Sequence, residues 1–265
     1  MTTRLQFETE WRDGKTILAN CFVTPPLKLA NITEDKQAGH LELMMMSSSP
    51  GILDGDDQGI SVKIGDNCTV RTSTQSFQRL FTMQKSATQT INIEVGNHAT
   101  LTWCPHPVVP HVGTSFTGVN HLYLTNTSKL IWSEIITCGR KQNGELFQFN
   151  KLHLSTKIFQ EGNLVLFENM FVVPATTHLL LFGLWEGFTH QATFIVVART
   201  ISPGKIQQIL QSILTIQQDI MFGISTTQSG AVLVRILGNK AEQLFSIAQQ
   251  MAAETRPILA GDVIK

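Results

Sequence analysis

The 265-residue chain has little charge and no excess of either sign. Charged residues make up 15% of it, against about 25% in an average soluble domain, and 20 Lys and Arg balance 20 Asp and Glu. Nucleic-acid and anionic-membrane binders usually carry a basic excess, so we expect neither partner. Two interpretations of the low charge stay open: a β-rich protein with uncharged polar residues outside, or a surface that partner proteins cover.

Paired cysteines and long apolar runs are also missing. The four cysteines, Cys21, Cys68, Cys104 and Cys138, are scattered and form no CxxC pair. No segment approaches the ~20 apolar residues that span a bilayer, and the first residues hold no apolar run of the signal-peptide kind. We therefore expect a soluble cytoplasmic protein with reduced thiols.

No strong catalytic signature occurs: the chain has no P-loop, dinucleotide fingerprint, GxSxG elbow or HExxH motif. A Ser/His/Asp triad stays open because its members can lie far apart, but no residues point to one. Asp54, Asp56 and Asp57 could together bind a hard cation through oxygen atoms. Their spacing is not that of an EF-hand, so an acidic surface loop is the favoured interpretation.

One segment offers soft metal ligands. Cys104, His106 and His111 place one sulfur and two imidazoles within eight residues, which suits nickel, zinc or copper. Three interleaved prolines stiffen the segment, and structural zinc sites usually have four ligands in two spaced pairs. A proline-stiffened loop with incidental His and Cys is the favoured interpretation.

The N-terminal half shows strand patterns. Leu5 to Val23 predicts a β-hairpin around Asp13-Gly14, and Leu41 to Met46 predicts a short buried strand. Trp132 to Leu152 predicts two strands joined by a turn at Asn143-Gly144. Glu134 and Arg140 flank that turn, where a structural ion pair between them is the favoured interpretation.

A strand-turn-strand pattern recurs along the chain. ISVKIGDNCTV at 60–70 aligns with INIEVGNHATL at 91–101, and two later copies follow. The predicted units lie near 60–75, 89–103, 116–140 and 145–173. Such units would stack around a shared core, which predicts a mainly β fold of layered, helically wound, β-solenoid-like strands. A small barrel is the less favoured alternative.

The pattern changes after residue 190. A strand at 191–199, a helix after Ser202-Pro203, strands at 220–226 and 231–237, and a second helix predict a βαββα segment. Asn239 and Glu242 have the spacing of a capping box for the second helix, and 255–265 is expected to be a tail. We predict a repeat-built β domain at 1–190 and a C-terminal segment at 191–265 packed on it, as one continuous domain.

Four strings, in order, carry a family resemblance. SEIITCGRKQNGELFQFNKLH at 133–153 holds a Glu, then Gly-Arg, then Glu-x-Phe. FVTPPLKL at 22–29, SSPGILDGD at 48–56 and TSTQSFQRL at 72–80 precede it. Over roughly residues 15–200 they resemble the urease accessory protein family UreD, and the match is closest to its diverged version, UreH.

The resemblance implies a non-catalytic scaffold for urease maturation. Such a protein would bind apo-urease and the accessory protein UreF, which recruits the GTPase UreG carrying nickel; a homodimer within this complex is compatible with that role. It also implies a mainly β fold with a helical winding of strands and a few helices. Nickel would be in transit through an internal passage, with no cofactor tightly bound.

The matching positions give candidates for the passage or for partner interfaces. Oxygen ligands suit transient, exchangeable metal contacts better than tight Cys/His cages. The candidates are Asp56, Thr74, Gln75, Glu134, Arg140 and Glu145. The family usually has apolar or non-ligating residues where this chain has Cys104, His106 and His111, which argues against a nickel site there.

Two other functions remain as alternatives. One is a β-solenoid enzyme acting on polysaccharide with Asp54, Asp56 and Asp57 as acid and base. The acidic cluster is local, and the chain has one Tyr and four Trp to stack on sugars. The other is a stand-alone nickel-binding protein that uses Cys104, His106 and His111.

Overall fold

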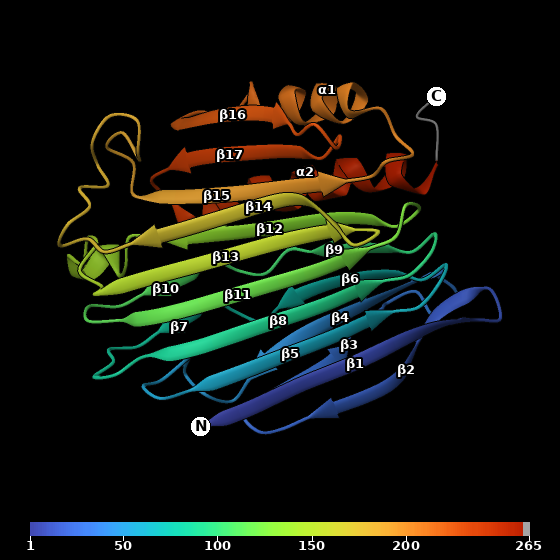
Figure 1. Cartoon of the computed structure of the whole chain (residues 1–265), viewed down its shortest axis with the longest axis horizontal. Helices are drawn as coiled ribbons and strands as arrows, with labels where there is room; N and C mark the ends of the chain where they lie inside the picture. Colours follow the sequence, from blue (N-terminus) through green and yellow to red (C-terminus); the bar gives the residue numbers. More distant parts are fainter. Residues whose placement is uncertain (262–265) are drawn as a thin grey trace.

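The computed structural model describes residues 1–261, and 49% of the chain lies in β-strands. The strands form a seven-stranded sheet and a ten-stranded sheet stacked face to face, here called the front and back sheets (Figure 1). The front sheet contains, in spatial order, β14 (Asn163–Val172), β13 (Lys151–Gln160), β11 (Ser115–Leu124), β8 (Ala87–Val95), β5 (Asp57–Ile64), β1 (Thr2–Arg12) and β2 (Lys15–Val23).

The back sheet is the larger one. Its strands are, in spatial order, β16 (Ile220–Thr226), β17 (Val232–Gly238), β15 (His190–Val197), β12 (Lys129–Thr137), β9 (Thr100–Trp103), β6 (Thr69–Thr74), β4 (His40–Ser47) and β3 (Leu27–Asn31). Two short strands, β7 (Gln78–Leu80) and β10 (Val108–Pro110), pair with each other, and β10 also pairs with β12.

The predicted repeats pair side by side. β5, β8, β11 and β13 are parallel neighbours in the front sheet, and β4, β6, β9 and β12 are parallel neighbours in the back sheet. Ile60 lies opposite Ile91 in the register of β5 with β8, which is the offset of the aligned sequence strings. Each of the first three units therefore puts one strand in the front sheet and the next in the back sheet.

The β-rich character is confirmed, but the solenoid-like description is not. Antiparallel pairs occupy both edges of each sheet. In the front sheet they are β13 with β14 and β1 with β2. In the back sheet β3 pairs with β4 at one edge, and at the other edge β12 pairs with β15, β15 with β17 and β17 with β16. The fourth repeat unit is itself an antiparallel hairpin, β13–β14, within the front sheet. Two stacked sheets with antiparallel edges therefore replace the continuous winding.

Alternating side chains explain the stacking. In β1, Leu5 and Phe7 are buried while the residues between them are not, and β4 and β5 show the same period of two. Their buried faces meet those of the opposite sheet in one apolar core. Within it Trp103 of β9 and Trp132 of β12 lie in register and stack, with 5.5 Å between ring centroids. Burial of these faces supplies the main force that holds the two sheets together.

The C-terminal segment extends the back sheet and covers its outer face. Helix α1 (Pro203–Leu214) and helix α2 (Ala241–Ala260) pack against β12, β15 and β17 through a second apolar cluster (Figure 1). The βαββα order is confirmed. Among the described residues neither helix is long and apolar enough to cross a membrane.

Two local predictions at these helices are wrong. Asn239 does not cap α2, because its Oδ1 atom accepts hydrogen bonds from Lys141 and Thr189 instead. The predicted tail is helical as far as Ala260, with Pro257 inside the helix, because buried Ile258 and Leu259 continue the apolar face of α2. The rest of that prediction, residues 262–265, lies outside the described residues.

The N-terminal hairpin and the strand at Leu41 to Met46 are confirmed as β1–β2 and β4. The hairpin predicted from Trp132 to Leu152 is wrong: β12 belongs to the back sheet and β13 to the front sheet. Between them the chain makes a single 3-10 turn, Lys141–Asn143, and an irregular loop. Phe147 has a φ of +52° and donates its N–H to the Cys138 carbonyl at 2.7 Å, so this segment is not extended.

Candidate functional site

A cavity of about 240 Å³ lies between the two sheets. Its lining comes from both sheets and includes the exposed residues Met1 and Leu53, so it reaches the surface at the loop before β5. Four of the six passage or interface candidates and one metal candidate line it: Asp56, Thr74, Gln75, Glu134 and His106. The fold thus gathers residues that are far apart in the sequence.

Glu134 is a half-buried carboxylate that lines this cavity. On β12 it shares the face of Trp132, which points between the sheets, so its side chain meets the front sheet. Asn120 donates to its Oε1 atom at 2.8 Å and Thr156 to its Oε2 atom at 3.2 Å. Burial raises the pKa of Glu134 to about 7.

No described Lys, Arg or His forms an ion pair with Glu134. The predicted pair with Arg140 is therefore wrong, because β12 carries Glu134 to the cavity while Arg140 lies in the exposed loop beyond its end. A carboxylate that faces a cavity with only hydrogen-bond donors around it keeps oxygen atoms for a passing cation. Oxygen ligands of this kind bind divalent metals in exchangeable fashion.

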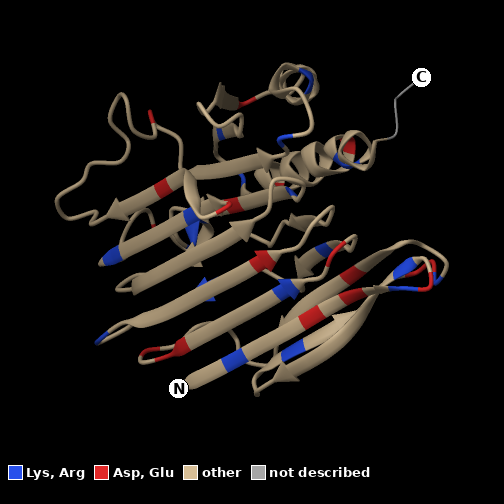
Figure 2. Cartoon of the chain, turned by 45° about the vertical axis from the view of Figure 1, so that its right-hand side comes forward, with Lys and Arg blue, Asp and Glu red and all other residues tan. Residues whose placement is uncertain are grey.

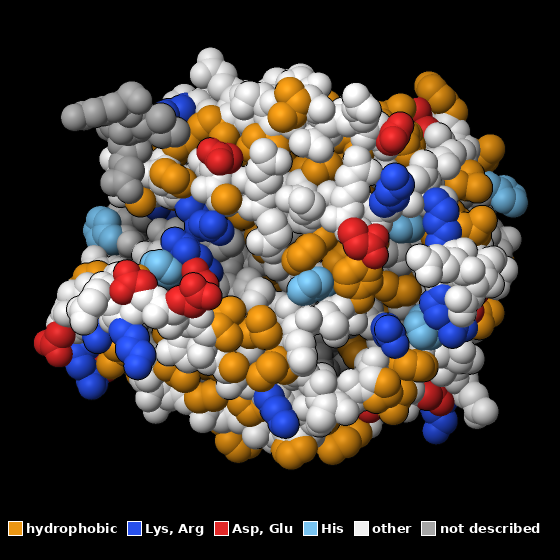
Figure 3. All heavy atoms as spheres, turned by 180° about the vertical axis from the view of Figure 1, so that it is seen from behind, with side chains coloured by type: hydrophobic (Ala, Val, Ile, Leu, Met, Phe, Trp, Pro, Cys, Tyr) orange, Lys and Arg blue, Asp and Glu red, His pale blue; other side chains and the backbone are white. Residues whose placement is uncertain are grey.

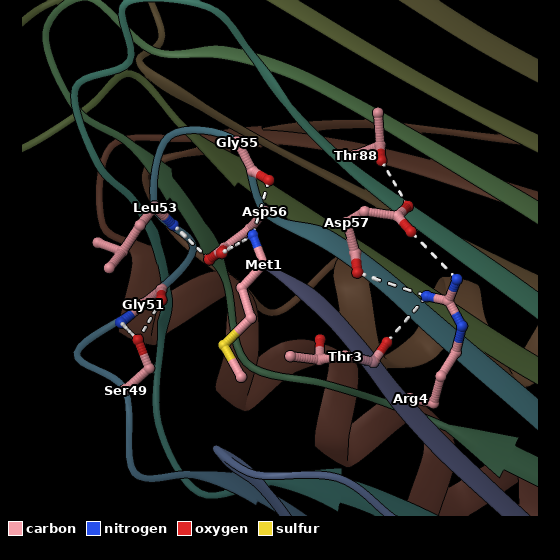
Figure 4. A network of polar contacts seen from close by, with 10 residues as sticks. All are labelled: Met1, Thr3, Arg4, Ser49, Gly51, Leu53, Gly55, Asp56, Asp57 and Thr88. Carbon is pink, nitrogen blue, oxygen red and sulfur yellow. Dashed lines mark hydrogen bonds and ion pairs between the residues drawn. The ribbon is translucent and has the colours of Figure 1, made fainter.

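The surface end of the cavity is formed by the loop that precedes β5 (Figure 4). Asp56 Oδ1 contacts the amino group of Met1 at 3.1 Å, and Asp56 Oδ2 accepts the Leu53 N–H at 2.8 Å. These contacts fix the loop across the start of β1. Asp56 thus has a structural role that is visible in its own contacts, at the position where the cavity opens.

The neighbouring aspartates are also engaged by the chain itself. Asp57 accepts Thr88 Oγ1 at 2.8 Å and pairs with Arg4 at 3.1 Å, and the Thr88 hydrogen bond is the first cause of its lowered pKa (Figure 4). Asp54 Oδ1 accepts the Lys85 N–H at 2.9 Å. An acid and base pair for glycoside cleavage needs two carboxyl groups that face a substrate. These contacts favour a structured acidic loop and give the polysaccharide enzyme no support.

Thr74 and Gln75 line the cavity from the end of β6. Thr74 Oγ1 accepts the backbone N–H of His106 at 2.8 Å and lies 3.0 Å from its Nδ1 atom. The His106 ring also stacks on Phe245 of α2, with 4.2 Å between ring centroids. His106 is therefore held between β6 and α2, and burial lowers its pKa, which favours the neutral ring.

The three soft metal candidates are not brought together. Among residues 1–261 no group of three His, Cys, Asp or Glu side chains is placed to hold a metal ion. Cys104 is 2% exposed and burial raises its pKa to about 12, so its thiol stays protonated. His111 packs against Phe81 with 4.8 Å between ring centroids, away from the cavity lining. A store built on these three residues has no support.

Arg140 and Glu145 form a separate pair at the end of β12. Arg140 Nε donates to Glu145 Oε2 at 3.0 Å and its Nη2 atom contacts Oε1, while the Val112 N–H donates to Oε2 at 3.3 Å. The hydrogen bond from Arg140 lowers the pKa of Glu145. Glu145 is buried and Arg140 is exposed, so the pair closes the loop and leaves one face of the guanidinium at the surface.

Sequence reasoning missed two residues that hold Glu134. Asn120 on β11 and Thr156 on β13 are buried, and they also bond each other at 2.8 Å. The sequence does contain a signal for Asn120. Alternate residues of the strand from Phe116 to Leu122 face inward, and Asn120 is one of them, so its amide needs a buried hydrogen-bond partner. The partner itself lies in the other sheet, which no strand pattern identifies.

Comparisons with known proteins agree with the resemblance to the UreD and UreH family. The two UreD relatives given below share more identity with the chain than the UreH relative does, so these identities do not support a closer match to UreH. The sequence matches the UreD urease accessory protein family over residues 1–264. It is 37% identical over 247 residues to the urease accessory protein UreD of Flavobacterium johnsoniae, covering 93% of this chain and 89% of that protein. For UreD of Acetivibrio thermocellus the identity is 34% over 246 residues, with coverages of 92% and 94%. For UreH of Helicobacter pylori it is 30% over 241 residues, with coverages of 91% and 89%.

Proposed function

The chain belongs to the UreD urease accessory protein family, and on this premise we propose that it is a non-catalytic maturation factor of urease that acts in the cytoplasm. Its relatives are named as accessory proteins of urease rather than as enzymes. The function comprises two tasks: scaffolding of the maturation complex and delivery of nickel to the urease active site.

The cavity between the sheets supports the delivery task and is the observation that carries the proposal. Its lining includes the surface loop at Asp56, the hydroxyl of Thr74, the amide of Gln75 and the half-buried carboxylate of Glu134. Nickel as cargo needs contacts that form and break, which single oxygen atoms offer and a closed Cys/His cage does not. Glu134, a carboxylate of this cavity with no ion-pair partner among the described residues, would bind nickel transiently in its ionised form.

The scaffolding task is supported by the surface. Charge of both signs is scattered over the strands, with no block of either sign (Figure 2). Large apolar side chains are exposed on β14 and in the loop before β15: Leu164, Phe167, Phe171, Leu181 and Phe182. A surface with little charge and such side chains suits a protein that partners cover. The partners we propose are apo-urease, UreF and, through UreF, UreG, with homodimers within the complex.

A co-expression experiment tests the proposal. The tagged chain is expressed with the urease subunits, UreF and UreG, the complex is isolated, and urease activity is measured after nickel addition. We expect all partners to co-purify and urease to stay inactive when the chain is omitted. A folded chain that captures none of them, and whose omission leaves activation unchanged, would disprove the proposed function.

A further inference from the structure

A second recess lies on the outer side of the back sheet, where the flank of α2 meets strands β4, β6 and β9. It is separate from the cavity between the sheets, because the two share no lining residue. Its polar lining includes Glu42 and Arg71 from the sheet and Gln249 and Arg256 from the helix. Viewed from behind, basic side chains gather beside histidine and acidic ones on the left of the molecule (Figure 3).

The recess holds more positive than negative charge. Arg71 Nη1 pairs with Glu42 Oε1 at 2.7 Å, and His40 Nε2 contacts the same oxygen at 3.1 Å. Arg256 also reaches the recess, and no described residue accepts a hydrogen bond from it or forms an ion pair with it. Two guanidinium groups therefore face a single carboxylate, and that carboxylate is already taken by Arg71.

Arg71 has hydrogen-bonding capacity left over. Its Nε atom is buried and has no partner among the described residues. A buried donor without a partner is costly, and most buried polar groups in native proteins are satisfied. Burial and the nearby Arg71 lower the pKa of Arg256, and burial and Arg71 likewise lower the pKa of His40. Burial is the larger cause of both shifts, and the positive charge of Arg71 adds to it.

The rest of the lining supplies no compensating anion. Cys104 borders the recess, but burial raises its pKa to about 12, so the thiol is neutral. The Gln249 amide is used on the Cys104 carbonyl at 3.3 Å. The recess measures about 240 Å³, several times the roughly 30 Å³ that one water occupies in the liquid.

We propose that this recess binds a small oxoanion of the size of phosphate or bicarbonate between Arg71 and Arg256. The planar, forked guanidinium group presents parallel N–H donors that match two oxygens of such an anion, and charge-assisted bonds of this kind are short and strong. The anion gives Arg256 a partner and balances the charge of the two arginines across the joint between α2 and the back sheet.

Isothermal titration of the purified full chain with inorganic phosphate, in a low-chloride buffer at neutral pH, tests the proposal. The test variant is Arg256→Gln, which removes a side chain that makes no hydrogen bond to the described residues. The matched control is Arg12→Gln, which changes the net charge equally at an exposed arginine paired with Glu10. We expect phosphate to bind the wild type and the control alike, and to bind Arg256→Gln about tenfold more weakly or worse, the loss of one charge-assisted bond.

A second readout separates binding from folding. Bound phosphate should raise the melting temperature of the wild type and of Arg12→Gln, and should raise that of Arg256→Gln less at the same phosphate concentration. Equal phosphate affinity in both variants would overturn the proposal, as would a wild type that shows neither heat nor thermal shift at millimolar phosphate. Far-UV circular dichroism of Arg256→Gln checks that the variant is folded.

Discussion

Glu134 and Glu145 come from one stretch of sequence, yet the fold gives them opposite environments. Glu134 faces the cavity with hydrogen bonds from Asn120 and Thr156, and its pKa rises to about 7. Glu145 lies in the loop beyond β12 against Arg140, and its pKa is lowered. Glu134 has no positively charged partner among the described residues, whereas Glu145 is already paired with Arg140.

The difference indicates separate roles: Glu134 is available to bind nickel in transit, whereas Glu145 stabilises the loop after β12. Burial without a counter-charge destabilises the ionised form of Glu134, and a cation that enters the cavity removes that cost. At Glu145 the ionised form is already stabilised by Arg140 and by the Val112 N–H. We therefore expect changes at Glu134 to affect delivery more than stability, and changes around Glu145 to affect the loop.

The largest expected effect is on urease activation by Glu134→Gln. The amide keeps the shape of the side chain: its oxygen can still accept from Asn120, and its NH2 group would donate to the Thr156 hydroxyl. It cannot carry the charge that attracts a divalent cation. Urease activity in the co-expression assay should fall by about tenfold or more, in the range typical for residues that support a metal site.

Glu94→Gln is the matched control, because it removes an exposed carboxylate from β8 of the opposite sheet. It should activate urease as the wild type does. Full activation by Glu134→Gln, with unchanged partner binding, would show that the cavity carboxylate is not used in delivery.

The same substitution should change the pH dependence of stability. The pKa of Glu134 rises from its ordinary value of 4.5 to about 7 in the folded protein, so the folded state retains a proton that the unfolded state releases. The wild type should therefore lose about 3 kcal/mol of unfolding free energy as pH rises from 4.5 through 7, and Glu134→Gln should lack this loss. Urea denaturation at pH 5 and pH 8 measures it; parallel pH profiles would contradict the raised pKa.

Gly139→Ala should destabilise the loop that carries Arg140. Gly139 has a φ of +123°, and a Cβ atom there would lie 3.1 Å from the Pro110 carbonyl oxygen and 3.2 Å from that of Glu145. The combined strain and crowding should cost about 1–3 kcal/mol of unfolding free energy. Gly144→Ala is the control, because its φ is also positive but no atom lies within 4 Å of the added Cβ. Equal losses in both variants would show that backbone strain alone acts.

Strand patterns predict much of this fold because each strand buries one face. The period of two in β1 and β4 is visible in the sequence, and so is the repeat offset that sets Ile60 opposite Ile91. The sequence does not indicate to which of the two sheets a strand belongs. Polar turns join β5 to β6 across the two sheets and β13 to β14 within one, although the strings around the turns are similar.

The candidate site is predictable to the same extent. The family resemblance located Glu134, Thr74 and Asp56, and the structure brings them to one cavity. It could not assign the partner of Arg140, because whether Glu134 or Glu145 meets the guanidinium depends on the loop path after Thr137. That path follows from tertiary contacts, such as the Phe147 N–H with the Cys138 carbonyl, that no local pattern encodes.

Arg140→Ala should have the smallest effect on stability. It removes an exposed partner of Glu145, whose lowered pKa contributes stability that is present above its ordinary pKa and is lost as pH falls through the folded value. The melting temperature of the variant should therefore lie slightly below that of the wild type at pH 7, and the two should converge in acid. Urease activation should fall even so, because the exposed guanidinium is a proposed partner contact, and Arg140→Lys, which keeps the charge but not the fork, should restore it only in part. If the Arg140→Ala chain fails to fold, Arg140 has a structural role in the loop and not a role in partner contact. Glu134 would then be the only carboxylate of this stretch with a role in urease activation.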